Sequence, residues 1–378
     1  MSVDSVEVAT RHHPHARAVL SPVVAGAASP SHAYLFHGPP GAGKADAARS
    51  FAAELIAEGA ADPGDARRRA LAGVHPDMTW VRPTGAAEML VGDIDEAVVM
   101  AATRTPFESR RRVFVIERAD TLTDQAANRL LKTLEEPPPF AHMILLTGRI
   151  GDALPTIRSR CLAVRFEALT ADQLADHLID EHACDLELAR SSARLARGDA
   201  RRARWLVTGQ GRALRSSAER YVRDAIAGEA ASRSWLELLK LARASGEDAK
   251  RATEEQFGER AEQLPRSDAA RIRREGEQAA RRAQRRAATG AIDDALRLSS
   301  LWLRDLACVA DGGDRQICNS DRLPALREDT ARIVRPGGLQ DAVLAVEDAR
   351  TTLIVNPSEE LLLEALALRV GRVLSGVS

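Results

Sequence analysis

The chain has 378 residues, 45% of them hydrophobic and 28% charged, with a formal net charge of -1. This length exceeds one compact core and predicts two or three domains. A charge near zero excludes general attraction to nucleic acid or an acidic membrane, so such binding would need a local patch. Aromatic residues make up 3%, which disfavours an independent single-strand DNA-binding protein that stacks bases.

Neither a membrane span nor a signal peptide is expected. No uncharged apolar run reaches about 18 residues. The apolar segment at residues 16–28 is short and interrupted by Arg17 and Pro22, unlike a signal peptide. We therefore expect a cytoplasmic protein.

The cysteines and histidines do not predict a metal site. The chain has four cysteines, at Cys161, Cys184, Cys308 and Cys318. They are far apart and include no C-x-x-C pair, so we expect reduced, mostly buried thiols and no zinc site or redox motif. The one dense histidine group is His12, His13 and His15, which we expect in an N-terminal tail.

The first part of the chain alternates short apolar runs with helical patterns. The runs are AYLF at 33–36, VFVI at 113–116 and MILL at 143–146. Runs of this kind between helical segments predict buried parallel strands of an α/β sheet. After residue 166 the apolar spacing becomes helical, with Thr170 as a candidate N-cap. Helical patterns continue to the end, and residues 246–290 are predicted to form an exposed or partly mobile helix.

The stretch GPPGAGKADAARS at 38–50 follows the first run and opens a helical pattern. Gly38, Gly43 and Lys44 match G-x-x-x-x-G-K-[ST], with Gly41 inside the loop. In such a loop backbone N–H groups face a phosphate and the lysine reaches the terminal phosphates. The alternative is a Gly/Pro-rich turn between a strand and a helix.

Three positions depart from a working ATPase site. Ala45 stands where a Ser or Thr hydroxyl would ligate Mg²⁺. The segment RRRVFVIERADTLT has Glu117 and Arg118 where a metal-binding acid and a catalytic glutamate are expected. Glu117 can accept hydrogen bonds, but Arg118 stays protonated and cannot be a general base. We expect a vestigial or weak nucleotide site without intrinsic ATPase activity, with Mg²⁺ only if ATP binds; alternatively, both residues merely cap a strand.

Two longer segments resemble a known family. NRLLKTLEEPPPFAHMILLT at 128–147 and LPTIRSRCLAVRF at 154–166 closely resemble bacterial DNA polymerase III clamp-loader subunits of the AAA+ class. HAYLFHGPPGAGK and HPD at 75–77 fit the same family. The altered nucleotide residues favour the delta-prime subunit over its relative tau/gamma, the motor subunit. The strong motifs cover about residues 32–166.

The resemblance implies three domains and a role in DNA replication. A RecA-like AAA+ domain with a parallel sheet is expected at 1–166, a three-helix lid at 167–225 and a helical collar for oligomerisation at 226–378. The implied function is a non-hydrolysing stator within a five-subunit ring that uses ATP to load the sliding clamp on primed DNA. The implied partners are tau/gamma and delta subunits; the alternative is an active tau/gamma-like motor.

The resemblance also implies roles for three polar residues. Arg160, in Ser159-Arg160-Cys161, is expected to project toward the nucleotide of a neighbouring motor subunit as an arginine finger. Arg201 and Thr147 occupy positions that sense nucleotide in working relatives. The alternative for Arg201 is a solvated helix charge.

Two further stretches differ from, or are not explained by, the family pattern. Many relatives carry a four-cysteine zinc module, but residues 59–73 contain no cysteine, so no zinc is expected. The basic run from Arg271 to Arg286 is predicted to be a solvated helix face because Glu275 and Glu277 interrupt it. Contact with template DNA is the alternative.

Overall fold

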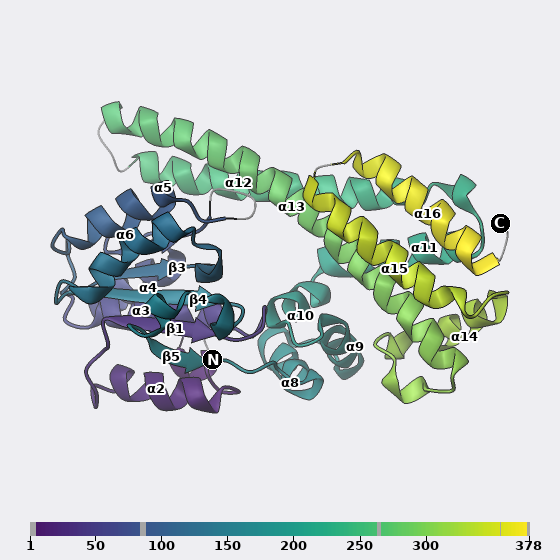
Figure 1. The fold of residues 1–378 in the computed structure, drawn as a ribbon, viewed down its shortest axis with the longest axis horizontal. Helices are drawn as coiled ribbons and strands as arrows, with labels where there is room; N and C mark the ends of the chain where they lie inside the picture. Colours follow the sequence, from purple (N-terminus) through teal and green to yellow (C-terminus); the bar gives the residue numbers. More distant parts are fainter. Residues whose placement is uncertain (1–4, 84–87, 263–265, 356, 376–378) are drawn as a thin grey trace. The chain divides into compact units, whose positions relative to one another are not determined.

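The computed structural model describes residues 5–83, 88–262, 266–355 and 357–375. The chain divides into two compact units, and Figure 1 shows the elements of each. Unit 1 comprises Met1–Glu181 and Arg197–Arg202, and unit 2 comprises His182–Ala196 and Ala203–Ser378. The separate lid and collar boundaries at 166 and 225 remain predictions.

Unit 1 is built on a five-stranded parallel sheet in the order β2-β3-β4-β1-β5. The strands are β1 (Ala33–His37), β2 (Met78–Val81), β3 (Arg112–Ile116), β4 (Ala141–Thr147) and β5 (Leu162–Arg165). The three predicted runs form β1, β3 and β4, which are the inner strands. The edge strands β2 and β5 have no continuous apolar run, because each buries only part of its surface.

Helices cover both faces of this sheet. In β3, Val113 and Val115 face one core while Phe114 and Ile116 face the other, as the alternation of side chains along a strand requires. The first core contains α1 (Val6–Ala9), α2 (Pro14–Val24), α3 (Lys44–Ala57) and α4 (Pro63–Ala72). The second contains α5 (Val91–Ile94), the π-helix at Asp95–Met100, α6 (Asp124–Glu135) and α7 (Pro155–Arg158). The parallel sheet covered on both faces confirms the predicted α/β AAA+ fold class.

The N-terminal segment is not a tail. Val6, Ala16 and Leu20 are buried in the first core, so α1 and α2 are part of unit 1. His13 is 3% exposed and directly precedes α2. The expectation of a histidine-bearing tail was therefore wrong, because the apolar residues around the histidines pack against the sheet.

Helix α8 (Ala171–His182) lies in unit 1 except for His182, and α10 (Ala200–Val207) contributes residues to both units. The remaining helices form unit 2: α9 (Leu186–Ala196), α11 (Gly209–Ile226), α12 (Trp235–Glu262), α13 (Arg266–Ala310), α14 (Leu323–Arg332), α15 (Gly338–Thr352) and α16 (Glu359–Ser375). Within the described ranges no helix has the length and apolar character needed to cross a bilayer.

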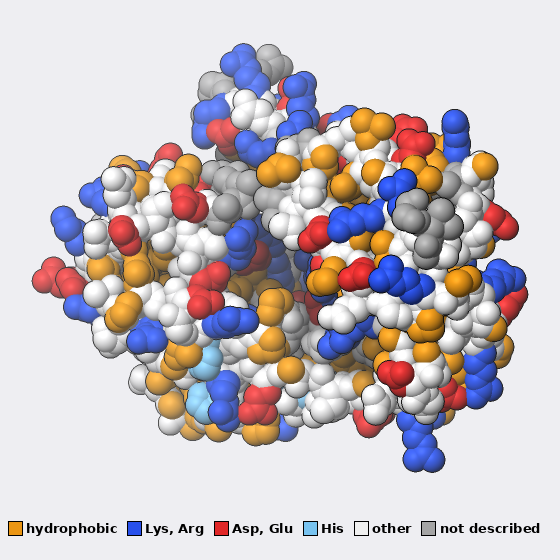
Figure 2. Space-filling model, turned by 45° about the vertical axis from the view of Figure 1, so that its right-hand side comes forward, with side chains coloured by type: hydrophobic (Ala, Val, Ile, Leu, Met, Phe, Trp, Pro, Cys, Tyr) orange, Lys and Arg blue, Asp and Glu red, His pale blue; other side chains and the backbone are white. Residues whose placement is uncertain are grey.

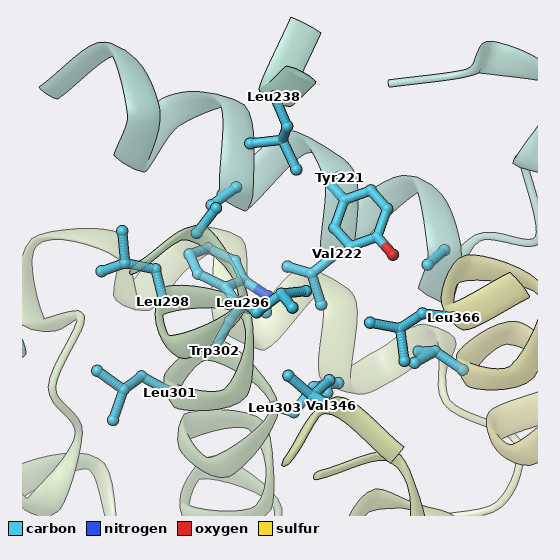
Figure 3. Close-up of a cluster of buried hydrophobic side chains, with 14 of the residues drawn as sticks. Tyr221, Val222, Leu238, Leu296, Leu298, Leu301, Trp302, Leu303, Val346 and Leu366 are labelled. Carbon is cyan, nitrogen blue, oxygen red and sulfur yellow. The ribbon is translucent and has the colours of Figure 1, made fainter. Parts of the chain in front are cut away.

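A buried cluster around Trp302 and Tyr221 holds unit 2 together (Figure 3). The Tyr221 hydroxyl of α11 donates to the Leu363 carbonyl of α16 at 2.7 Å. Trp302 Nε1 donates to Asp329 Oδ2 at 3.0 Å. Both polar atoms of the aromatic residues are therefore satisfied inside an apolar core.

The stretch 246–290 is helical as predicted and lies in α12 and α13, apart from residues 263–265, which lie outside the described residues. All four cysteines are described; each is half-buried and none is in a disulfide. They are less buried than expected, and their reduced state remains a prediction.

Candidate functional site

The glycine-containing loop connects β1 to α3 as the sequence predicts. Gly41 and Gly43 have φ values of 77° and 80°, in the left-handed region that glycine adopts readily. A Cβ on Gly41 would lie 2.2 Å from Asp199 Cγ. Ala200 N donates to the Gly41 carbonyl at 2.9 Å. Gly41 is thus required by its close approach to the segment that opens α10.

Lys44 is bound by its own loop. Its Nζ donates to the carbonyl of Gly38 at 2.5 Å and to that of Pro39 at 2.7 Å. Burial lowers the pKa of Lys44 to about 8, although Asp120 and Asp199 oppose this shift. A phosphate at this loop would have to compete with two existing hydrogen bonds for the ammonium group.

Asp199 adds a negative charge beside the loop. Its Oδ1 accepts from Arg202 N at 3.0 Å at the start of α10, and its Oδ2 lies 3.5 Å from Arg202 Nη2. A carboxylate against Gly41 disfavours an approaching phosphate by charge repulsion. We did not predict this residue from the sequence, although its place in GDARRA, two residues before Arg201, is a signal that could have found it.

Glu117, at the end of β3, is engaged by the neighbouring strand. Its Oε1 accepts from Trp80 Nε1 at 2.6 Å and from Arg82 Nε at 3.1 Å. Trp80 has a second charged neighbour, because the Arg49 guanidinium carbon lies 4.4 Å from the centroid of its ring. One carboxylate oxygen, Oε1, is therefore already engaged by two donors.

Arg118 follows with a left-handed φ of 54°, and its carbonyl accepts from Thr121 N and Thr121 Oγ1, each at 2.8 Å. Residue 118 thus starts the short turn after β3, as the strand-capping alternative anticipates. Together with Ala45, which offers no ligand atom, the engaged Glu117 means that these residues do not fit the Mg²⁺ site of a working ATPase.

The two expected sensor residues lie in different settings. Thr147 is buried at the end of β4, where its Oγ1 donates to Arg149 O at 2.9 Å and accepts from Arg149 N at 3.3 Å. Its hydroxyl therefore stabilises a local turn. Arg201 is exposed in the first turn of α10, next to Asp199. Its sensor role remains a prediction.

Arg160 lies just after α7 with its side chain 35% exposed. Nη2 donates to Glu135 Oε1 at 2.6 Å, and Nη1 donates to Thr156 O at 3.0 Å and Ser159 Oγ at 3.1 Å. Glu135 is the last residue of α6 and belongs to LEEPP. The tertiary structure therefore joins the two most distinctive motifs at one surface position.

The HPD motif has a structural role. Asp77 is fully buried, and its carboxylate accepts from the backbone N of Phe107 at 2.6 Å and from those of Glu108 and Ser109 at 2.9 Å each. His75 Nδ1 accepts from Asp77 N at 3.2 Å. The motif fixes the loop before β3 and contributes no group to the candidate nucleotide site.

His13 is a residue of the loop region that we did not predict from the sequence. Its ring centroid lies 4.9 Å from that of Phe166, and its Nδ1 accepts from Glu167 N at 3.3 Å. Burial and the neighbouring His12 lower the pKa of His13 to about 4. A neutral histidine thus packs behind the loop, where Nε2 would be 3.8 Å from a Cβ on Gly43.

Across the described ranges, no group of three or more His, Cys, Asp or Glu side chains is arranged to hold a metal ion. The absence of zinc remains a prediction that elemental analysis can test.

The family model described as "DNA polymerase III, delta subunit" matches residues 23–170. The DNA polymerase III delta-prime subunit of Bacillus subtilis is 38% identical over 159 residues, which cover 40% of this chain and 46% of that protein. Residues 23–170 are thus similar to delta and delta-prime subunits of bacterial DNA polymerase III. The chain spans about half the length of the delta-prime relatives that it matches.

Gamma/tau subunits of DNA polymerase III are also similar to this chain. The gamma/tau subunit of Mycobacterium tuberculosis is 35% identical over 158 residues, 39% of this chain and 26% of that protein. A solved gamma subunit-related protein from Thermotoga maritima is 18% identical, with a TM-score of 0.46, over 93% of this chain and 98% of that one. A similarity at this TM-score does not establish function, and the fold class follows from the sheet and helices described above.

Proposed function

We propose that this protein is a delta-prime-like subunit of the DNA polymerase III clamp loader. In this proposal it does not hydrolyse ATP and instead supplies Arg160 to the ATP of a neighbouring tau/gamma subunit. Its further partners are the delta subunit and, through the assembled complex, the sliding clamp and primed DNA in the cytoplasm. The similarity of residues 23–170 to delta-prime subunits supports this assignment.

One observation carries the non-hydrolysing role. Glu117, the acid that follows β3, accepts hydrogen bonds from Trp80 and Arg82. Ala45 supplies no hydroxyl at the loop position where Ser or Thr would ligate Mg²⁺. Arg118, which is cationic, replaces the catalytic glutamate. A group that activates water must accept a proton at working pH, which a guanidinium cannot do.

The finger role is supported by the chemistry of Arg160. A guanidinium is always charged and offers several donors to phosphate oxygens. Its ion pair with Glu135 joins side chains that are 35% and 49% exposed, and such pairs contribute roughly 0–1 kcal/mol. Exchange of Glu135 for a neighbour's phosphate therefore costs little.

The second candidate function is an active tau/gamma-like motor. It is favoured by the retained Lys44 and loop glycines and by similarity to gamma/tau subunits. ATP turnover by the isolated chain separates the two functions. We expect background turnover; robust Mg²⁺-dependent turnover that Lys44→Ala abolishes would favour the motor and contradict our proposal.

A reconstituted loader tests the finger directly. We expect Arg160→Ala to assemble normally with tau/gamma and delta, yet to lower clamp- and DNA-stimulated ATPase and clamp loading by about tenfold. Sole arginine fingers contribute about 10³ to 10⁵, but a ring with several sites loses less. Lys44→Ala should have much less effect. Size exclusion and phosphate release measure these properties.

The matched control is Arg158→Ala, since Arg158 is a nearby exposed arginine whose Nη1 lies 3.4 Å from Ile150 O. It should leave ATPase and loading near normal. Equal activity of Arg160→Ala and the unsubstituted protein would contradict the finger assignment. A greater loss with Lys44→Ala would indicate a working nucleotide site in this subunit.

A further inference from the structure

The helical hairpin of α12 and α13 has no role in the function proposed above. The two helices lie side by side within unit 2 (Figure 1). They approach so closely that a Cβ on Gly276 of α13 would lie 2.7 Å from Phe257 Cβ of α12. Gln284 Nε2 donates to Glu247 Oε1 across the pair at 2.6 Å. These contacts fix which face of α13 packs and which face meets solvent.

The solvent-facing side of α13 carries a row of arginines. Ile272, Gly276 and Ala280 are buried on the packed side. At about 100° per residue, six arginines fall within an arc of about 140° on the opposite side. We call these six residues the arginine face; all are exposed: Arg271, Arg274, Arg281, Arg282, Arg285 and Arg286.

This face is largely uncompensated. Arg271 Nη1 pairs with Glu275 Oε1 at 2.8 Å, whereas the other five make no ion pair with a described residue. Residues 271–286 contain seven arginines and two glutamates, a net charge of +5 in a chain of net charge -1. Figure 2 shows several Lys and Arg side chains, with Asp and Glu side chains among them, on the surface at the top of the picture. Positive charge is thus concentrated locally.

We infer that the arginine face binds the phosphate backbone of double-stranded DNA. From residue 271 to 286 the helix rises about 22 Å, which matches about six base pairs at 3.4 Å per step along one strand. Guanidinium groups bind phosphate oxygens with paired N–H donors. A rigid row of them therefore suits a regular polyanion and reads no particular sequence.

Other polyanionic partners fit this face less well. A membrane-binding helix needs an apolar face, but the apolar side of α13 packs against α12. A protein interface needs apolar anchors, and the large exposed hydrophobic side chains of the described part of unit 2 lie outside residues 246–290. Single strands are bound by aromatic stacking, and residues 266–290 contain no aromatic residue.

The test measures duplex binding by the isolated full-length protein, using fluorescence anisotropy of a labelled duplex of arbitrary sequence of about 20 base pairs. The variant replaces Arg281, Arg282, Arg285 and Arg286 by Gln, a good helix former. The control replaces four exposed arginines elsewhere in unit 2 by Gln: Arg251, Arg327, Arg332 and Arg369. Both variants have the same net charge, and circular dichroism checks that both keep their helices.

We expect the variant to bind the duplex at least about tenfold more weakly at about 50 mM salt, with a salt slope shallower by about 3 to 4. The control should bind within about twofold of the unsubstituted protein. If the fourfold variant loses helical signal, the pairs R281Q/R282Q and R285Q/R286Q should each show about half the change in slope.

Three outcomes would overturn the inference: no duplex binding by the unsubstituted protein, equal losses in variant and control, or tighter binding to anionic vesicles or polyglutamate than to the duplex at equal salt. The assay contains no other loader subunit and no ATP. Its failure therefore leaves the proposed finger function standing, and failure of the finger leaves this inference standing.

Discussion

Replacement of Asp77 by alanine should release the loop before β3 and destabilise unit 1. The buried carboxylate accepts three backbone N–H bonds, from Phe107, Glu108 and Ser109, at 2.6 to 2.9 Å. Hydrogen bonds to a charged group contribute roughly 1.5–3 kcal/mol each, so the sum is about 4.5–9 kcal/mol. Phe107 is 83% exposed, so the backbone N–H groups of the freed loop can bind water instead. These new hydrogen bonds offset part of the lost free energy. We expect a net loss of about 3–4 kcal/mol.

Hydrogen exchange measured by mass spectrometry is a suitable assay because it resolves the two units. Asp77→Ala should remove protection from a peptide covering residues 104–111 and lower the opening free energy of the slowest amides of β3 and β4. Asp77→Asn keeps one acceptor oxygen and should lose about half as much. The exposed Asp152 supplies the control, Asp152→Ala, expected within about 0.5 kcal/mol. Unchanged protection of 104–111 in Asp77→Ala would refute the clamp role.

Three other measurements test different parts of the molecule. Burial and His12 lower the pKa of His13 from 6.5 to about 4 in the folded protein. As the pH falls, the unfolded chain therefore takes up this proton before the folded protein does. The contribution of His13 to the free energy of unfolding is fully present above about pH 6.5 and decreases toward pH 4, by up to about 3 kcal/mol. His13→Asn should therefore flatten the dependence of the urea-unfolding midpoint on pH between pH 7 and 4.5. A slope equal to that of the unsubstituted protein would contradict this. Tyr221→Phe removes the hydrogen bond from the hydroxyl to the Leu363 carbonyl and should cost about 0.5–1.5 kcal/mol in urea unfolding followed by tryptophan fluorescence. An unchanged midpoint would show that this bond does not stabilise unit 2. Elemental analysis of tag-free protein should find no stoichiometric zinc, and one zinc per chain would disprove the expectation drawn from the scattered cysteines.

The sequence by itself determined most of the local elements and the similarity to delta-prime subunits. The apolar runs of β1, β3 and β4 are short, continuous and flanked by helical patterns, as expected for parallel strands buried on both faces. The loop at 38–43 was recognisable because a glycine pattern between strand and helix follows from backbone geometry. The edge strands β2 and β5 lacked such a signal because they bury fewer side chains.

The tertiary structure decided which partners the site residues have. Glu117 is held by Trp80, 37 positions earlier, and Arg160 by Glu135, 25 positions earlier. Asp199 lies against Gly41 across an even longer separation. No periodicity encodes such pairings, because the packing of whole elements brings these atoms together.

The same limit applies to charge and burial. The sequence showed the basic run, but the packing of α13 against α12 decided that six of its arginines share one exposed face. The histidines near the N-terminus looked like a tail, yet the adjacent apolar residues fold against the sheet and bury His13. A side chain's local sequence sets its chemistry; its surroundings, and hence its charge state and availability, are set by elements that may be distant in the chain but pack beside it.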